Sequence, residues 1–397
     1  MSATAPREAL RLLTARRAVG ATRLDKGRSA AYEPRIRILD GWRGVSILLV
    51  IAGHLVNYRY WDDSPVNLLY RIADVLSVTG VDIFFVISGF IITTLALREE
   101  ETFGQFSPAA FYIRRILRII PPYFLYLLCI LYLSVIGKIG QLPSQTLLGA
   151  AFACNLPQAD CGWFVGHSWS LAYEEQYYLL FPILFLWLGR SFGRILGLLL
   201  IVLLGLPTLR LALNLGPVWF AICHASFFVS FICIGALMAA YSGRLKQISE
   251  NRYAAHAIVL AAICLAGLLW LDVFSHARPD LQRLVKLRTV LVPALEPLCI
   301  AWLVGSSVYI KHWASRLLGS VPLQFLGMIS YSLYLWQQLF TSSPAAYHGA
   351  PWLKFAPLML VVAVLSYYLV ERPCIRLAKR IIATRHAQSV SSIPVTR

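Results

Sequence analysis

The sequence predicts an all-α membrane protein with about ten transmembrane helices. Of its 397 residues, 58% are hydrophobic and 14% are charged, whereas about a quarter of a soluble domain is charged. The mean hydropathy is +0.66, which excludes an ordinary soluble enzyme and a disordered chain. Ten apolar stretches are long enough to cross a hydrocarbon core, which takes roughly 20 helical residues: 44–60, 74–97, 119–137, 172–189, 192–209, 219–241, 255–271, 289–309, 323–341 and 355–371.

Two of these stretches leave the count open. Residues 172–189 and 192–209 are short, and only Gly189, Arg190 and Ser191 separate them.

The basic excess indicates topology. The chain has 36 Lys and Arg residues against 19 Asp and Glu residues, a formal charge of +17. With ten spans and cytosolic termini, 27 basic residues fall on the cytosolic side and 9 on the other, as the positive-inside rule predicts. We therefore expect a multi-pass membrane protein with both termini in the cytosol, in contact with lipid and not with nucleic acid. Residues 1–35 form an expected flexible basic tail, 36–378 the membrane domain and 379–397 a cytosolic C-terminal tail.

The cysteines fit this map. Cys154 and Cys161 share one outside loop, where either a disulfide or two free thiols is compatible with the spacing. No His/Cys spacing resembles a zinc site, so no metal is expected.

Arg43 and His54 are the first polar residues in an expected span. Eleven helical steps separate them, about 16 Å along the axis, which places Arg43 at the cytosolic interface and His54 beyond the midplane. An ionisable residue inside a membrane is a functional-site hypothesis by default. A hydrogen-bonded interior histidine, or one that snorkels to the outer interface, is the structural alternative for His54.

The second span carries Asp82 near its outer end and Ser88-Gly89 farther in. Small residues let helices pack closely in lipid, and this explains Gly89. Ser88 fits either a packing or a catalytic role.

Three arginines precede the third span. Arg118 follows Arg115 by three residues and Arg114 by four, so both are its neighbours on a helix. A Pro-Pro pair follows at 121–122. Arginine forks bind phosphate in bidentate fashion. A plain positive-inside anchor is the alternative, and a site for a phosphorylated cosubstrate explains the cluster better.

Acidic residues mark three further positions. Glu174 and Glu175 begin the fourth span, and their side chains point about 100° apart, so we do not expect a paired acid–base dyad. One of them could orient a partner such as His54 or an arginine. Glu296 lies between two prolines in the eighth span, and for Glu371 we expect a structural salt bridge.

Six segments in a fixed order resemble the acyltransferase-3 family of bacterial multi-pass membrane proteins. The resemblance covers roughly residues 36–378. The segments are LDGWRG at 39–44 with GH at 53–54, VDIFFVISGF at 81–90, RRILRIIP at 114–121, WSLAYEEQYY at 169–178, ISYSLYLW at 329–336 and VERP at 370–373.

The resemblance implies transfer of an acyl group from acyl-coenzyme A in the cytosol to a hydroxyl of a glycan or small lipophilic acceptor. It carries functional roles to Arg43 and His54, to Ser88, and to the arginine pair at 115 and 118. Family members often have histidine where this chain has Gln337, so either that histidine is dispensable here or the acceptor preference differs. No extra soluble domain follows, so we expect the membrane domain to do the chemistry alone.

These observations combine into a mechanistic hypothesis. The arginines bind the phosphates of acyl-coenzyme A, and His54 acts as general base on the acceptor hydroxyl or as a nucleophile through an acyl-histidine. Glu174 or Glu175 fixes the imidazole tautomer, and the acceptor, most simply a cell-surface glycan that receives acetyl, arrives from the outer side. A transporter or flippase of the acyl donor or a lipid-linked glycan is the competing class, although no internal repeat of the transporter kind is visible. The sequence does not indicate the oligomeric state.

Overall fold

The computed structural model describes residues 36–60, 68–251, 253–310, 313–342, 347–348 and 355–391. Within these ranges every regular element is a helix, short loops join the helices, and one isolated bridge pairs Ile139 with Tyr347. The longer helices are α2 (Arg37–Tyr60), α3 (Leu68–Phe103), α4 (Pro108–Val135), α7 (Ser168–Leu188), α8 (Phe192–Ala212), α9 (Pro217–Ala240), α11 (Ala254–Ala277), α12 (Gln282–Tyr309), α14 (Val321–Phe340), α15 (Ala356–Ser366) and α16 (Arg372–Ser391). The expected N-terminal tail, residues 1–35, lies outside the described residues.

The all-α polytopic class is confirmed. Eight described segments are long and apolar enough to span a membrane: α2, α3, α4, α8, α9, α11, α12 and the continuous α15–α16 segment. The other two expected spans correspond to the helices α7 and α14, which have 21 and 20 residues. These two helices are not among the eight segments. Both contribute polar side chains to the cavity described below. The short 3₁₀ turn Gly189–Ser191 separates α7 from α8, so these are two helices.

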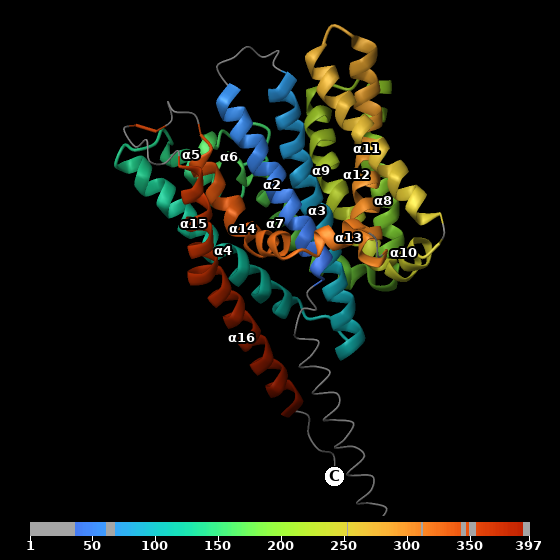
Figure 1. The fold of residues 1–397 in the computed structure, drawn as a ribbon. Helices are drawn as coiled ribbons and strands as arrows, with labels where there is room; N and C mark the ends of the chain where they lie inside the picture. The colour runs from blue at the N-terminus through green and yellow to red at the C-terminus, as the bar shows by residue number, and fades with distance from the viewer. Residues whose placement is uncertain are drawn as a thin grey trace, which may run out of the picture.

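The bundle has two distinct ends (Figure 1). At one end, α2 and α4 begin, α3 finishes, and α16 extends away from the bundle; we call this the basic end, after Arg37, Arg98, Arg114 and Arg118. At the other, the disulfide end, the short helices α5 (Pro143–Ala150) and α6 (Gly162–Gly166) pack beside the loop that joins them. Helix α16 continues through Ser391, so residues 379–391 of the expected C-terminal tail are helical.

Close helix packing holds the centre of the bundle together. A Cβ atom on Gly89 of α3 would collide with the backbone carbonyl of Ile232 on α9, and one on Gly235 of α9 would collide with that of Val86 on α3. The two helices therefore touch backbone to backbone. The packing role expected for Gly89 is confirmed, and its neighbour Ser88 faces the cavity on the other side of α3.

We expect Gly89→Ala to lower the thermal stability of the detergent-solubilised protein, because overpacking a tight contact costs about 1–3 kcal/mol. Gly205→Ala on α8 is the matched control, since a Cβ there meets no atom within 4 Å. Thermal unfolding should show a lower midpoint for Gly89→Ala and an unchanged or higher one for Gly205→Ala. Equal midpoints for the two variants would contradict this account of the α3–α9 contact.

The loop at the disulfide end is covalently closed. Cys154 and Cys161 form a disulfide with a Cα–Cα distance of 5.9 Å, which decides between the two possibilities that the sequence leaves open. Asp160 accepts hydrogen bonds from the backbone N–H of Gly162 and the amide of Gln145, and these donors hold the pKa of Asp160 below its ordinary value. The loop thus has a defined shape next to α6 and the start of α7.

Candidate active site

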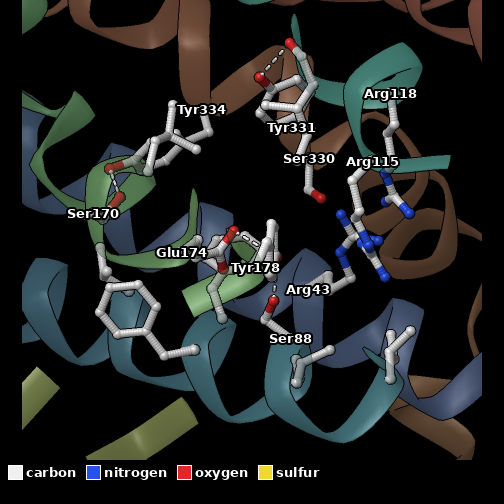
Figure 2. Close-up of a pocket in the computed structure, with 17 residues that line it drawn as sticks. Arg43, Ser88, Arg115, Arg118, Ser170, Glu174, Tyr178, Ser330, Tyr331 and Tyr334 are labelled. Atoms are coloured by element: carbon white, nitrogen blue, oxygen red, sulfur yellow. Dashed lines mark hydrogen bonds between the residues drawn. The ribbon is translucent and has the colours of Figure 1, made fainter. Parts of the chain in front are cut away.

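A cavity opens among α2, α3, α4, α7 and α14 (Figure 2). Its lining residues Arg43 and Arg115 lie in the first halves of α2 and α4, which begin at the basic end. Its volume is about 90 Å³, several times the room that one buried water needs. Apolar side chains form much of the wall, including Phe84, Phe85 and Leu171. The polar lining residues are Arg43, Ser88, Arg115, Arg118, Ser170, Glu174, Tyr178, Ser330, Tyr331 and Tyr334.

Three of the four predicted arginines line this cavity. Figure 2 shows the guanidinium groups of Arg43, from α2, and of Arg115 and Arg118, from α4, gathered on one side. The Arg115 guanidinium lies over the Tyr178 ring, 5.1 Å from its centroid. Arg43 and Arg118 repel each other electrostatically, a cost that a bound anion relieves. The grouping suits phosphate, which accepts several bidentate hydrogen bonds.

Arg114 faces elsewhere. Its guanidinium forms an ion pair with Glu99 of α3 at 2.6 Å, and Glu99 also accepts a hydrogen bond from the backbone N–H of Ser107. Arg114 therefore ties the end of α3 to the start of α4, and it is not among the residues that line the cavity.

A hydroxyl chain crosses the middle of the cavity. The Tyr178 hydroxyl donates to Glu174 at 3.0 Å, and the Ser88 and Tyr178 hydroxyl oxygens lie 2.5 Å apart. Since Tyr178 donates its only hydroxyl proton to Glu174, Ser88 is the donor in the second bond. Glu175 is not a lining residue, and its Oε1 is buried without a hydrogen-bond partner among the described residues. The two glutamates thus diverge, as their adjacent helix positions predict.

His54 lies farther along α2, toward the disulfide end, and does not line the cavity. Its Nδ1 is 2.7 Å from Oε1 of Gln337 on α14. The Gln337 amide nitrogen donates to Gln338, and the Gln338 amide nitrogen donates to the carbonyl of Trp163. This chain fixes the orientation of the Gln337 amide, so Nδ1 of His54 carries the proton and Nε2 is left as an acceptor. That tautomer suits a general base.

The tautomer hypothesis for the glutamates is wrong. Glu174 is occupied with Tyr178, and Gln337 holds the His54 ring instead. The physical reason is position: Gln337 is one turn beyond Tyr334 on α14, at the same level of the bundle as His54, whereas Glu174 lies beside the arginines. The residue that departs from the family pattern is therefore the one that orients the histidine.

Comparison with known proteins identifies the family of this chain. A family model described as an acyltransferase domain matches residues 36–371. The chain belongs to this acyltransferase family. It is 27% identical to "Putative peptidoglycan O-acetyltransferase YrhL" of Bacillus subtilis (strain 168), over 84% of this chain and 54% of the relative. It is 26% identical to "Peptidoglycan O-acetyltransferase OatA" of Listeria monocytogenes, over 87% of this chain and 56% of the relative.

The chain spans about half the length of the curated relatives it matches. No solved structure matches.

Replacement of Gln337 by leucine should lower the kcat of this acyltransferase-family protein. Without its acceptor the His54 ring is free to turn and change tautomer. A typical hydrogen bond contributes about 0.5–1.5 kcal/mol, so kcat should fall roughly 2- to 10-fold. Gln337→Glu keeps an acceptor at the same place and should retain more activity than the leucine variant. Steady-state acyl transfer, with thermal unfolding to confirm folding, makes the comparison; wild-type kcat in Gln337→Leu would contradict this role.

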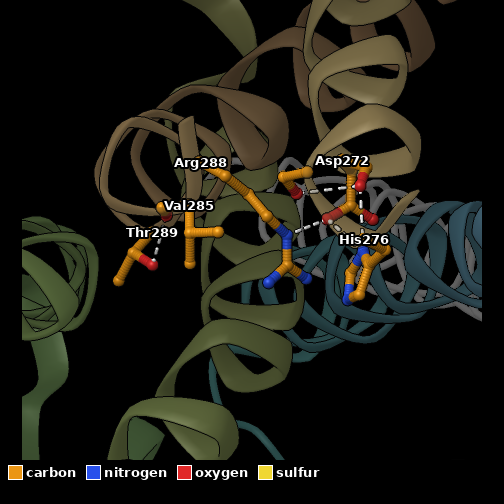
Figure 3. A network of polar contacts seen from close by, with 6 residues as sticks. Asp272, His276, Val285, Arg288 and Thr289 are labelled. Atoms are coloured by element: carbon orange, nitrogen blue, oxygen red, sulfur yellow. Dashed lines mark hydrogen bonds and ion pairs between the residues drawn. The ribbon is translucent and has the colours of Figure 1, made fainter. Parts of the chain in front are cut away.

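A second polar network lies among α3, α11 and α12, apart from the lining of the cavity. Arg288 of α12 pairs with Asp272 of α11, whose neighbour His276 lies one turn away (Figure 3). Asp82 of α3 and Glu296 of α12 are almost completely buried, and both interact electrostatically with Asp272. This network connects α11 and α12 near the end where they meet, a structural role that the sequence did not predict for Asp272.

The sequence missed several residues of the site. Tyr178, Ser170, Tyr331 and Tyr334 line the cavity, although only Glu174, Ser88 and the arginines were singled out there. The sequence could have predicted Tyr178, because it follows Glu174 by four residues and therefore lies on the same helix face. Glu371 accepts a hydrogen bond from Ser332 and interacts electrostatically with Arg118 and Arg43 just beyond the cavity wall.

Proposed function

We propose that this protein is a membrane O-acetyltransferase that moves an acetyl group from cytosolic acetyl-coenzyme A to a hydroxyl of a cell-surface or exported glycan. The observation that carries the proposal is the joint placement of Arg43, Arg115 and Arg118 in one cavity, with an oriented histidine farther along α2. The choice of acetyl and of a glycan acceptor is supported by the names of two relatives, one called a peptidoglycan O-acetyltransferase and the other a putative one.

In the proposed complex, the arginines hold the phosphates of acetyl-coenzyme A at the basic end. Along α2, Arg43 and His54 are separated by about 16 Å, a gap that the extended pantetheine arm of the donor bridges. The thioester then lies near His54, and the apolar side chains of the cavity wall surround the arm. Tyr178, Ser88 and Glu174 border this path.

In the proposed reaction, His54 carries the proton from the acceptor hydroxyl to the leaving thiolate. Nε2 of His54 takes the proton of the acceptor hydroxyl as its oxygen attacks the thioester carbonyl carbon. The tetrahedral intermediate expels the coenzyme A thiolate by breaking the C–S bond, and the imidazolium returns the proton to sulfur. The acyl-histidine variant differs in that Nε2 itself attacks the carbonyl carbon first. A labelled acyl-enzyme trapped by acid quench, absent from His54→Ala, would establish the variant.

The membrane orientation follows from the same proposal. The basic end faces the cytosol, where acetyl-coenzyme A is made, and the disulfide end faces the oxidising side of a bacterial plasma membrane. A single cysteine introduced at Glu101 should react with a membrane-impermeant thiol reagent only after the cells are broken. A single cysteine introduced at Leu156 should react in intact cells. The reverse pattern would contradict the orientation.

The activity test uses purified protein, radiolabelled acetyl-coenzyme A and soluble peptidoglycan fragments. We expect label on the glycan as an alkali-labile ester, with release of one free thiol for each ester formed. Transport of intact acetyl-coenzyme A into vesicles, with no ester and no thiol release, would favour the transporter class and overturn the proposal.

A further inference from the structure

His167 is a buried histidine at the junction of α6 and α7 with no assigned role. Only 4% of its surface is exposed. Neither Nδ1 nor Nε2 has a hydrogen-bond partner among the described residues. The backbone of Leu335 interacts electrostatically with the ring but does not hydrogen-bond to either ring nitrogen.

The surroundings explain why both nitrogens lack a protein partner. The ring packs at nearly a right angle to the Tyr126 ring and at a tilt to the Tyr334 ring, at centroid distances of 5.5 and 5.3 Å. The hydroxyls of both tyrosines are already used: Tyr126 donates to the carbonyl of Phe164, and Tyr334 to the backbone carbonyl of His167 itself. A neutral imidazole has one donor and one acceptor, and burying either without a partner is destabilising. The free-energy cost of burying the unpartnered donor or acceptor is removed if a ligand supplies the missing hydrogen-bond partner.

The position of His167 indicates which ligand could supply a hydrogen-bond partner for its ring. On the cavity side, Tyr334 lines the cavity and Ser170 lies one turn along α7. On the other side, Trp163 precedes His167 by four residues and its ring contacts His54 at a centroid distance of 5.8 Å. His167 and His54 are near enough to interact electrostatically. The unpartnered imidazole thus lies between the cavity that would hold the donor and the histidine that would activate the acceptor.

We propose that His167 is a second catalytic histidine, whose ring N–H donates a hydrogen bond to the carbonyl oxygen of the acetyl group. This inference rests on the proposed acetyl transfer. As the acceptor oxygen adds to the carbonyl carbon, the carbonyl oxygen becomes an oxyanion, and a preorganised donor in a water-poor site stabilises that charge. No bond to His167 forms or breaks, and the proton of the acceptor still passes through His54.

The test compares His167→Phe and His167→Gln with the wild-type protein and with His256→Phe. Phenylalanine keeps the ring contacts but has no donor, glutamine restores an N–H, and His256 is an exposed residue of α11. Steady-state transfer from radiolabelled acetyl-coenzyme A to peptidoglycan fragments gives kcat and KM, and thermal unfolding in detergent gives the midpoint.

We expect His167→Phe to lower kcat on the order of 10²- to 10³-fold, with little change in the KM for acetyl-coenzyme A. Its unfolding midpoint should equal or exceed that of the wild type, because two unsatisfied buried groups are removed. His167→Gln should recover part of the lost kcat, and His256→Phe should behave as wild type.

Two results would overturn the inference: wild-type kcat in His167→Phe, or parallel loss of activity and thermal stability that glutamine does not rescue. The first excludes contact with the reacting atoms, and the second indicates a purely structural residue. If the wild-type protein forms no acetyl ester, the proposed function itself fails, which is a distinct outcome from an active wild type with an active His167→Phe.

Discussion

Substitution of His54 by alanine should abolish acetyl transfer while leaving the protein folded and able to bind acetyl-coenzyme A. His54 is the residue whose Nε2 is left as an acceptor when its Nδ1–H donates a hydrogen bond to Oε1 of Gln337. Loss of a positioned general base commonly lowers kcat by about 10²- to 10⁴-fold. Because the arginines line the cavity and His54 does not, the KM for the donor should change little.

The control for this prediction is His256→Ala, an exposed histidine of the same bundle. It should leave both kcat and the unfolding midpoint unchanged. Turnover of His54→Ala at a tenth of the wild-type rate or more would remove His54 from the mechanism, even if Gln337→Leu proved impaired.

Substitution of Arg115 or Arg118 by alanine should weaken donor binding strongly. Both guanidinium groups line the cavity, and a hydrogen bond to a charged group contributes about 1.5–3 kcal/mol, so the KM for acetyl-coenzyme A should rise on the order of tenfold to a hundredfold for each. Arg115→Lys keeps the charge but loses the bidentate fork, and it should fall between wild type and Arg115→Ala. Titration of initial rates against donor concentration measures the effect.

Arg114→Ala is a control within the same helix turn. Arg114 pairs with Glu99 outside the cavity, so its loss should lower thermal stability with little effect on the KM for the donor. A raised KM in Arg114→Ala, with unchanged KM values in Arg115→Ala and Arg118→Ala, would show that the anion site is on the other face of α4.

The helices were predictable because the bilayer imposes their length and polarity. Each expected span, including the doubtful pair at 172–209, corresponds to a helix in the structure. Packing contacts such as Gly89 against Ile232 were predictable in kind but not in partner, because small residues indicate a close approach without naming the other helix.

The site was predictable only where residues share a helix. The grouping of Arg115 with Arg118 follows from their spacing, and so does the divergence of Glu174 from Glu175. The His54–Gln337 bond joins residues 283 positions apart, and only tertiary packing decides that glutamine rather than a glutamate reaches the ring. Helical spacing also could not separate Arg114 from its neighbours, because its partner Glu99 belongs to another helix.

The unpartnered state of His167 could not be predicted from the sequence either. It lies two residues before the WSLAYEEQYY segment, yet nothing in one sequence distinguishes a histidine with satisfied ring nitrogens from one without. That distinction appears only when the hydroxyls of Tyr126 and Tyr334 are seen to be bonded elsewhere.

The most direct test of the central claim separates donor from acceptor by a membrane. Purified protein is reconstituted into liposomes that contain peptidoglycan fragments, and radiolabelled acetyl-coenzyme A is added outside. The account predicts acetyl ester on the enclosed glycan, with free coenzyme A thiol appearing outside, and no ester in liposomes that carry His54→Ala. Intact labelled acetyl-coenzyme A inside the liposomes, or ester formation that survives the loss of His54, would contradict it.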